Sequence, residues 1–298
     1  MIGIKDYKQV SMGDRPLFQE YFNRFPQTHT EYLYTGLVCW SHYTPAFYTV
    51  RDGSLLIMNM LEGKPQFRPP VGERNDVILG EVLDLAKREG GKKAVIAIDE
   101  SAKEWINASH PKINVQADRD FFDYVYLAKS LAELRGKPYE NQRNHLNKFH
   151  RKYAYSVERI DQQNRDEVAE FLQRWCLARD CEEDRMLEEE KKAILFCMDR
   201  FFELELSGIV IRIDGKIQAL SVWEQITKET AAIHYEKGMQ EYDGIYPAIN
   251  NEAAKILAKD YKYINRESDL GIPGLRTAKE RLHPDHMETL YYIDRDSL

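Results

Sequence analysis

The sequence predicts a mixed α/β protein made of two related units, and three observations support this. The same order of elements, a hairpin, a helix, a strand and a second helix, can be read twice along the 298 residues. Each hairpin carries an Asp-Gly pair, and each first helix has apolar residues at helical spacing. The length suits about two domains, and a hydrophobic content of 43% is enough to form a buried core.

The two hairpins are the clearest copies of the repeat. The segment FYTVRDGSLLIMNM begins at Phe47, and the segment IVIRIDGKIQALSV begins at Ile209. Both predict a strand, a tight turn and a strand, because an Asp-Gly pair supplies the positive φ that a tight hairpin turn requires. The Asp-Gly pair at positions 52–53 therefore corresponds to the pair at positions 214–215.

Each hairpin is followed by a helix, a strand and a second helix. The segments VILGEVLDLAKREG from Val77 and AINNEAAKILAKDY from Ala248 have apolar residues at i, i+3, i+4 and i+7, which predicts helices. The segments KKAVIAID from Lys92 and YKYINRES from Tyr261 predict short strands after those helices. The last helical segments of the two copies are AKEWINAS and GLRTAKERL.

Further helices separate the two copies. The segment YLAKSLAELRGKPYENQRNHLNKFHRKY from Tyr126 bridges them, and a glycine and a proline divide it into two helical pieces with a turn between. Two more helices are predicted before the second hairpin, DEVAEFLQRWCLARDC from Asp166 and MLEEEKKAILFCMDRFFELE from Met186. We expect an N-terminal domain of residues 1–125 and a C-terminal domain of residues 126–298, which carries the predicted active site.

Composition argues against several classes of protein. The net charge of -7 gives no overall reason to expect a nucleic acid or an anionic membrane as partner. No apolar run approaches the ~18–20 residues that span a bilayer, and the start MIGIKDYKQV lacks the regions of a signal peptide, so we expect no integral membrane association. The cysteines form no Cys-x-x-Cys pair, which favours a reduced cytoplasmic protein with buried thiols at Cys39, Cys176, Cys181 and Cys197.

A basic stretch, GKPYENQRNHLNKFHRKY, stands out in this acidic chain. Its apolar residues recur at helical spacing and would face the core, whereas Arg143 and Arg151 lie on a different face. The natural partners of such a face are phosphates, on a nucleotide carrier, a tRNA or a lipid headgroup. The alternative is a solvated basic helix. The bases of this stretch, set against the single acid Glu140, are Lys137, Arg143, Lys148, Arg151 and Lys152.

A loop between a strand and a helix is a second candidate site. In AAIHYEKGMQEYDGIYPAINNEAAKIL, from Ala231, a strand ends near Lys237 and a helix begins near Tyr246. A helix N-terminus offers free N–H groups and the positive end of the helix dipole to an anion. Gly244 is the one glycine placed to help, so an ordinary strand-loop-helix turn is an equal alternative.

The stretch ESDLGIPGLRTAKERLHP is a third candidate site. Glu267 and Asp269 follow a predicted strand, and ligands of open α/β sheets collect at the carboxyl ends of strands. Two carboxylates there could hold a substrate ammonium or take a proton from an attacking amine. Arg276 and Lys279 lie about one helical turn apart and can face the same pocket. The alternative is a salt-bridge cluster that fixes the last helix.

The order of elements in each copy is that of the GNAT (N-acyltransferase) fold. In that fold two central strands splay apart, and the gap between them receives an acyl carrier. Backbone groups at the gap lack ladder partners and can bind a ligand carbonyl or amide. The chain has no P-loop, no Rossmann glycine run and no Gly-x-Ser-x-Gly elbow, and HPDH at 283–286 lacks further metal ligands, so we expect no metal site.

Three long segments resemble a known family. LRGKPYENQRNHLNKF, IHYEKGMQEYDGIYPAINNE and YINRESDLGIPGLRTAKERLHP look like the DUF2156 family, which is related to the C-terminal domain of phosphatidylglycerol lysyltransferase and lies near the Fem-type aminoacyltransferases. The resemblance runs from about Leu134 to Pro284. It implies a tandem GNAT-like (acyl-CoA N-acyltransferase) fold with two related mixed-sheet domains, which agrees with the repeat.

The resemblance also implies functional residues. Positions that match the family's basic stretch, central strand and helix start would bind substrate or carrier: Arg143, Asn144, Lys148, His234, Glu236, Lys237, Gly244, Tyr246 and Asn250. Asn265 and Arg266 in the terminal signature would also bind substrate. The rest of that signature includes Gly271, Gly274 and Leu275, and its predicted catalytic residues are Asp269, Glu267, Arg276 and Lys279.

These residues predict an acyltransferase that moves an aminoacyl group from aminoacyl-tRNA to an amine or hydroxyl. Arg143, Lys148 and the helix start would contact carrier phosphates, and Asp269 or Glu267 would hold the donor's ammonium. The acceptor would be a small molecule, a peptide or a lipid headgroup, and no cofactor is expected to be tightly bound. One alternative keeps the fold but uses acyl-CoA as donor. Another is a non-catalytic binding module on the same scaffold.

Overall fold

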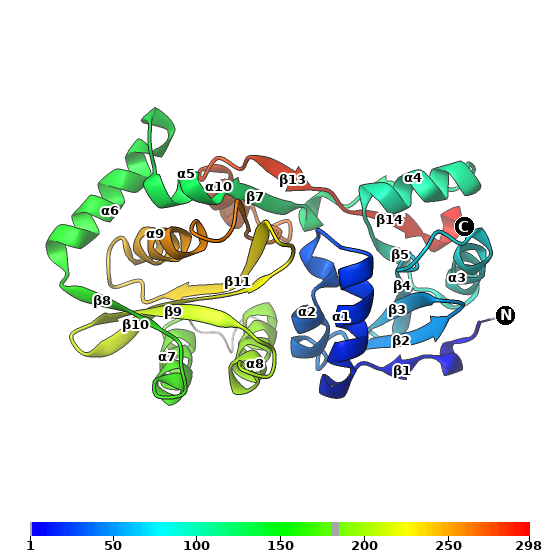
Figure 1. Cartoon of the computed structure of the whole chain (residues 1–298), viewed down its shortest axis with the longest axis horizontal. Coiled ribbons are helices and arrows are strands. Elements are labelled where there is room, and N and C mark those ends of the chain that lie inside the picture. Colours follow the sequence, from blue (N-terminus) through cyan, green and yellow to red (C-terminus); the bar gives the residue numbers. More distant parts are fainter. Residues whose placement is uncertain (1, 180–184) are drawn as a thin grey trace. The chain divides into compact units, whose positions relative to one another are not determined.

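The chain forms two compact units, shown in Figure 1. The structure is a computed structural model and describes residues 2–179 and 185–298. One unit consists of Met1–Phe122 with Glu288–Leu298, and the other of Asp123–Met287. Each unit has its own mixed sheet, as the repeat in the sequence predicts.

The division between the units differs from the predicted one at both ends of the second unit. The expected boundary after residue 125 lies inside strand β7 (Asp123–Leu127), which belongs to the second sheet. The residues from Glu288 onward belong to the first unit, because β14 (Tyr291–Asp294) lies between two strands of the first sheet. Short strands such as these carry too little periodicity to be recognised in the sequence.

The first sheet contains one parallel pair of strands, β4 with β5, among antiparallel neighbours. Its order is β1 (Lys8–Gln9), β2 (Ala46–Arg51), β3 (Ser54–Leu61), β4 (Lys64–Phe67), β5 (Lys93–Ile98), β14 and β6 (Gln116–Ala117). Its α-helices are α1 (Arg15–Arg24), α2 (Tyr34–Cys39), α3 (Asp76–Glu89) and α4 (Glu100–Ser109). Short 3-10 helices are η1 (Ile4–Asp6), η2 (Met12–Asp14), η3 (Thr30–Tyr32), η4 (Arg119–Phe121) and η7 (Arg295–Ser297).

The second sheet repeats this plan. Its order is β13 (His286–Glu288), β7, β12 (Tyr263–Asn265), β11 (Thr230–Gly238), β10 (Lys216–Gln225), β9 (Ser207–Ile213) and β8 (Tyr155–Arg159), and β11 with β12 is its parallel pair. Its helices are α5 (Ala128–Glu133), η5 (Lys137–Tyr139), α6 (Glu140–Lys152), α7 (Arg165–Leu177), α8 (Arg185–Asp199), α9 (Ile245–Leu257) and α10 (Pro273–Glu280).

The two sheets have the same order of strands when the first is read from β1 and the second from β8. Four antiparallel strands are followed by a parallel fifth, and then by two strands that come from elsewhere in the chain. The strand next to the fifth is β14, near the C-terminus, in the first sheet and β7, which precedes the rest of its unit, in the second. Each unit therefore completes its sheet with a strand from beyond the predicted repeat.

The turns and caps form for the reasons that the sequence indicates. Asp52 and Asp214 adopt φ of 48° and 50°, and the glycine after each is also left-handed, as tight hairpins require. The Asn75 side chain accepts hydrogen bonds from the backbone N–H groups of Val77 and Ile78 and so caps α3. Asp99 caps α4 in the same way, through the N–H of Ala102.

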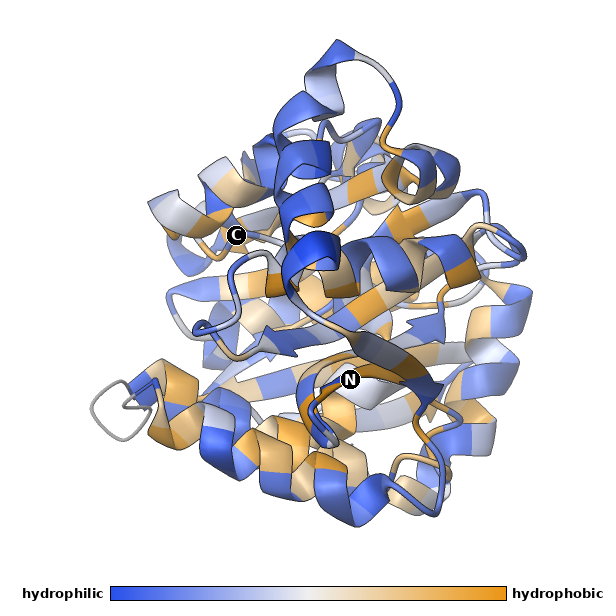
Figure 2. Ribbon diagram, turned by 90° about the vertical axis from the view of Figure 1, so that its left-hand side faces the viewer, coloured by the Kyte–Doolittle hydropathy of each residue, from blue (hydrophilic) through white to orange (hydrophobic). Residues whose placement is uncertain are grey.

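Helices cover both faces of the second sheet. Figure 1 shows α9 on one face and α7 and α8 on the other. The face under α9 holds an apolar core that includes Ile211, Trp223 and Ile233 from the strands and Ile249 from α9. In Figure 2, α6 lies toward the viewer and is coloured mostly as hydrophilic residues. Its buried residues are Leu146 and Phe149.

The predictions on thiols are confirmed in part. Cys39 and Cys197 are buried cysteines outside any disulfide, but the expectation is wrong for Cys176, which is disulfide-bonded. Cys181 lies outside the described residues. No helix within residues 2–179 and 185–298 has both the length and the apolar character needed to cross a membrane.

Candidate functional site where two parallel strands separate

The central parallel strands of the second unit separate after three paired positions. Their register ends at Ala232 opposite Asn265, but β11 continues to Gly238 whereas β12 stops. The chain after β12 instead follows β7: the Arg266 N–H donates to the Tyr124 carbonyl at 2.9 Å. The edge of β11 beyond Ala232 therefore has no partner in β12, as in the splayed strands that the sequence predicts.

A β-bulge aims His234 at this separation. Trp223 pairs with Ile233 and Val222 with Tyr235, so His234 is an extra residue on β11. Its Nδ1 lies 2.7 Å from Oε1 of Glu267, and its Nε2 lies 2.7 Å from Oε1 of Glu224.

The two carboxylates hold His234 in its charged form. Burial would lower the pKa of the imidazole, but its hydrogen bonds to Glu224 and Glu267 raise that pKa well above its usual value. A protonated imidazole donates from both nitrogens, which matches two carboxylate partners. Glu224 was not identified from the sequence. It lies near the end of a predicted strand, and the bulge that turns His234 toward it has no sequence signal.

Glu236 and Lys237 lie on opposite faces of β11, because successive strand residues point to opposite sides of a sheet. Glu236 forms a buried ion pair with Arg266, and the Asn250 amide oxygen, in its better orientation, faces the Arg266 guanidinium from α9. Lys237 instead pairs with Glu190 of α8 at 2.8 Å. The structure thus brings Glu236, Arg266 and Asn250 together and places Lys237 away from them.

Lys279 is the buried residue of α10, a helix that otherwise has no buried side chain. Its Nζ donates to the backbone carbonyls of Arg266 and Glu267, the latter at 3.1 Å. Burial, followed by the charge of Arg266, lowers the pKa of Lys279 to about 8. Lys279 is therefore an ammonium at neutral pH that loses its proton more easily than an exposed lysine.

Asp269 is completely buried and has several donors around its carboxylate. Arg276 donates from Nε and Nη2, each at 2.9 Å, the Tyr124 hydroxyl donates at 2.6 Å, and the Gly271 N–H donates at 2.9 Å. Burial would raise the pKa of Asp269, but these hydrogen bonds outweigh it and hold the pKa far below its usual range. This geometry is that of the alternative we considered, a salt bridge that fixes the last helix.

The turn between β12 and α10 has an unusual backbone. Glu267 and Leu270 adopt positive φ of 59° and 51°, and Gly271 follows at 73°. Left-handed residues other than glycine are uncommon and need support from their surroundings. Asn265 provides part of it: its Oδ1 accepts from the Glu267 N–H at 2.8 Å, and its Nδ2 donates to Asp123 at 2.9 Å.

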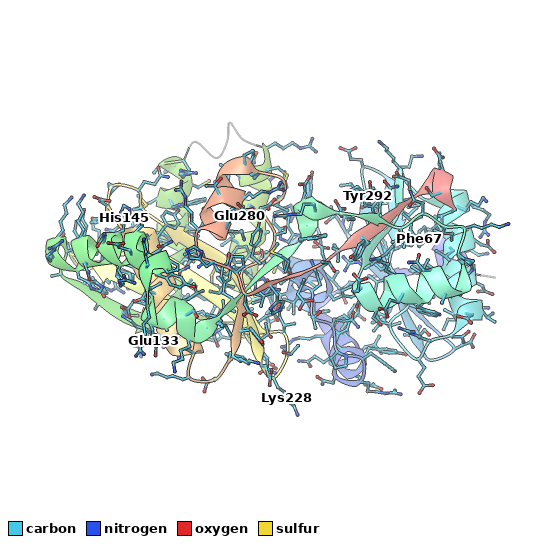
Figure 3. All side chains as sticks on the ribbon, turned by 90° about the horizontal axis from the view of Figure 1, so that it is seen from above. Phe67, Glu133, His145, Lys228, Glu280 and Tyr292 are labelled. Carbon is cyan, nitrogen blue, oxygen red and sulfur yellow. The ribbon has the colours of Figure 1, made fainter. Side chains whose placement is uncertain are left out.

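The residues predicted on the basic helix have other contacts. Arg143 donates to the carbonyls of Leu134 and Gly136, the latter at 2.6 Å, and so closes the turn before α6. Lys148 pairs with Asp243 at 2.5 Å, and Asn144 is exposed. Figure 3 labels His145 on this helix, another of its exposed residues.

Gly244 begins α9 and packs tightly against α6. It adopts φ of 89° as the N-cap residue, with Tyr246 part-exposed in the first turn. A Cβ at this position would lie 2.9 Å from the carbonyl oxygen of His145 and 3.0 Å from Cβ of Phe149. The glycine is required by both its conformation and its space, so the backbone here is already in contact with α6.

Replacing Gly244 with alanine is expected to lower the free energy of unfolding by about 2–3 kcal/mol, because left-handed strain and a close contact add together. The control is Gly215→Ala, which has φ of 74° but no atom within 4 Å of the added carbon, and which should cost about 1 kcal/mol. Urea unfolding measures the free energy of unfolding of both variants. Equal decreases in the two variants would show that the contact with α6 has no effect on stability.

Among the described residues no group of three or more His, Cys, Asp or Glu side chains is arranged to hold a metal ion. The polar side chains at the separated strands form instead a connected set of hydrogen bonds and ion pairs. In the second unit they are His234, Glu224, Glu267, Glu236, Arg266, Asn250 and Lys279. Such a set can orient a polar substrate, donate hydrogen bonds to a carbonyl and accept a proton.

Comparison with known proteins shows the family to which the chain belongs. A family model described as "Phosphatidylglycerol lysyltransferase, C-terminal" matches residues 22–294. A conserved protein of unknown function from Bacteroides thetaiotaomicron has a similar structure, with a TM-score of 0.88, 26% identity, and coverage of 97% of this chain and 99% of that one. A search of curated proteins finds no match.

Two more distant structures are similar in fold. The C-terminal DUF2156 domain of a putative lysylphosphatidylglycerol synthetase from Agrobacterium fabrum has a TM-score of 0.67 at 15% identity, over 96% of this chain and 94% of that one. The structure of FemX has a TM-score of 0.57 at 10% identity, over 97% of this chain and 98% of that one. With the repeated strand order, these likenesses confirm the predicted tandem GNAT-like fold.

Proposed function

The chain belongs to the family of phosphatidylglycerol lysyltransferase C-terminal domains, and from this premise we propose that it transfers an aminoacyl group from aminoacyl-tRNA to an amine or hydroxyl acceptor. The observation that carries the proposal is the charged cluster where β11 and β12 separate. Acyl transfer needs a place for the ester carbonyl between donors and a proton acceptor near the attacking group. The cluster contains both kinds of group.

Lys279 is the proposed donor to the ester carbonyl. It is an ammonium fixed by the carbonyls of Arg266 and Glu267, so part of its hydrogen-bonding capacity is held in place before substrate binds. As the acceptor attacks, negative charge develops on the carbonyl oxygen, and a fixed cation stabilises that charge. The β11 edge beyond Ala232 offers further N–H donors in the same region.

Glu267 is the proposed proton acceptor. Its side chain is 36% exposed, more than that of Glu224 or Glu236, so an attacking amine or hydroxyl can reach it. The acceptor atom bonds to the carbonyl carbon and passes its proton to the carboxylate. The ester C–O bond then breaks, and the ribose oxygen of the tRNA leaves with that proton. No covalent intermediate on the protein is required, because alignment of the two substrates supplies much of the rate.

The carrier is proposed to contact the exposed bases of α6. Arg151 and Lys152 are exposed on this helix, which shows mostly hydrophilic residues in Figure 2. Exposed bases along one helix suit the phosphates of an RNA backbone. An acyl-CoA donor would need a phosphate site at the start of α9, where Gly244 is already packed against α6. Since charged tRNA is a cytoplasmic donor, the proposal places the protein in the cytoplasm.

Filter binding of the purified protein to mixed aminoacyl-tRNA tests the proposal. Deacylated tRNA and acetyl-CoA serve as competitors. We expect charged tRNA to bind at least about tenfold more tightly than deacylated tRNA, a difference of ~1.4 kcal/mol, and acetyl-CoA not to displace it. Tight binding of acetyl-CoA without a preference for charged tRNA would replace the proposed donor by acyl-CoA. Binding of neither ligand would favour the non-catalytic alternative.

A further inference from the structure

Several buried polar atoms of the second unit have no hydrogen-bond partner among the described residues, and two of them face each other beside the candidate site. They are Oε1 of Glu236 and Oγ of Ser221. The Ser221 residue is fully buried and the Glu236 side chain is only 8% exposed. Buried polar groups are nearly always satisfied, so a carboxylate oxygen and a hydroxyl that lack a partner among the described residues are available to a water or a ligand.

The two atoms belong to neighbouring side chains on one face of the sheet. Ser221 of β10 and Glu236 of β11 are directly opposite each other in the antiparallel register, so their side chains point to the same side. The next pair on this side is Ala219 with Gly238, and a Cβ on Gly238 would touch Ile245 of α9. Both atoms therefore lie on the α9 side of the sheet.

The other oxygen of Glu236 connects this location to the proposed reaction centre. Oε2 is paired with the Arg266 guanidinium, and the backbone carbonyl of the same arginine accepts from Lys279. Glu236 and Lys279 are thus separated by a single residue that contacts both. Both groups therefore border Arg266 at the separated strands.

We propose that Oε1 of Glu236, with Oγ of Ser221, binds the α-ammonium of the aminoacyl donor, so that Glu236 is a specificity-determining residue for donors with a free amino group. The inference rests on the proposed function. A primary ammonium has several N–H donors and can satisfy both acceptors at once. Its bond to a carboxylate is charge-assisted and stronger than a bond from a neutral group.

The inference assigns the donor's ammonium to Glu236 instead of to Asp269 or Glu267, the carboxylates that the sequence favoured. Asp269 accepts hydrogen bonds from Arg276, Tyr124 and Gly271, and Glu267 accepts one from His234. Oε1 of Glu236 is instead a buried carboxylate oxygen that has no hydrogen-bond partner among the described residues, and Glu236 is directed to the face on which Arg266 and Asn250 meet.

The test compares binding of aminoacyl-tRNA with binding of the same tRNA after N-acetylation of the aminoacyl group, which removes the ammonium and keeps the ester. Wild-type protein is expected to prefer the free amino form by about tenfold or more. Glu236→Gln can still accept from Arg266 but offers an N–H in place of Oε1, so it should bind both forms equally. Ser221→Ala should reduce the preference several-fold.

Matched control variants lie in the same unit. Glu190→Gln removes the carboxylate of the Lys237 ion pair on the opposite side of β11, and Ser207→Ala removes an exposed hydroxyl of β9. Both should keep the wild-type preference. If Glu236→Gln does not fold, Ser221→Ala decides, and an unchanged preference in that variant overturns the inference.

The binding results distinguish failure of the ammonium site from failure of the proposed function. If wild-type protein prefers charged over deacylated tRNA but ignores N-acetylation, the ammonium site is wrong and the proposed function stands. If charged tRNA has no advantage, the proposed function fails, and calorimetry with amino-acid methyl esters and their N-acetyl derivatives tests the ammonium site alone. Equal binding of the two kinds of ester, or a crystal structure with only an ordered water between the two atoms, overturns it.

Discussion

Replacing Asp269 with asparagine is expected to lower the free energy of unfolding by about 2–4 kcal/mol, because it weakens several charge-assisted hydrogen bonds to a buried carboxylate whose partner Arg276 is 33% exposed. The carboxylate is fully buried, and Arg276 donates to it twice. An amide cannot accept both of these bonds, because its nitrogen would face the guanidinium. The Tyr124 hydroxyl and the Gly271 N–H would also lose an ionised acceptor.

Urea unfolding followed by tryptophan fluorescence measures this loss. Asp243→Asn is the matched control, because it breaks an exposed ion pair. In that pair the Lys148 side chain is 59% exposed and the Asp243 side chain is 44% exposed. An exposed pair contributes about 0–1 kcal/mol, so this variant should unfold nearly as the wild type does. Equal stability of Asp269→Asn and Asp243→Asn would show that the Asp269 ion pair does not hold α10 in place.

The same ion pair predicts the direction of a pH effect. The hydrogen bonds of Asp269 hold its pKa in the folded protein below the value of about 3.9 expected when unfolded. The unfolded state therefore binds a proton first, and the stabilising contribution is complete above about pH 4 and is lost progressively as the pH falls further. In Asp269→Asn this part of the acid dependence should be absent.

Replacing Lys279 with methionine is expected to lower enzyme-dependent aminoacyl transfer by about 10²–10³-fold, the usual effect of removing one oxyanion donor. Methionine is similar in length and apolar, so it suits a buried position but cannot donate to a carbonyl. Transfer of a radiolabelled aminoacyl group from tRNA to an acceptor amine, corrected for the rate without protein, measures the effect. Lys279→Arg keeps a cation and should retain more activity than Lys279→Met.

The pH profile distinguishes this role of Lys279 from a structural one. Burial lowers the pKa of Lys279 to about 8, so the ammonium is present below that pH and is lost above it. If the ammonium is the donor, wild-type transfer should fall as the pH rises through about 8. The Lys279→Met variant should lack this alkaline decline. An alkaline decline that persists in that variant would assign it to another group.

The sequence predicted the parts of the fold that depend on local patterns. The Asp-Gly hairpins, the helices from Val77 and Ala248 and the strands that follow them are recognisable because turn chemistry and apolar spacing act over a few residues. The short strands β7 and β14 were missed. Their place in a sheet depends on pairing with residues far away in the chain, and a few residues carry no periodicity of their own.

The sequence predicted the location of the candidate site more accurately than the contacts of its individual residues. The terminal signature does bring Glu267, Arg266 and Lys279 to the separated strands. The sequence could not show that a bulge directs His234 to Glu224, or that Lys237 points away from Glu236. A residue type indicates which hydrogen bonds a side chain can make, but its partners are set by register and by which face of the sheet it occupies.

The sequence alone was enough to predict that the chain has two mixed α/β units and that charge gathers where the last central strand ends. These properties follow from local periodicity, from turn residues and from composition. The three-dimensional structure was needed to show which charges are already paired, as in Asp269 with Arg276, and which atoms lack a partner among the described residues, as in Oε1 of Glu236. The physical reason is that pairing depends on distance and burial in three dimensions, and both are produced by contacts between residues far apart in the sequence.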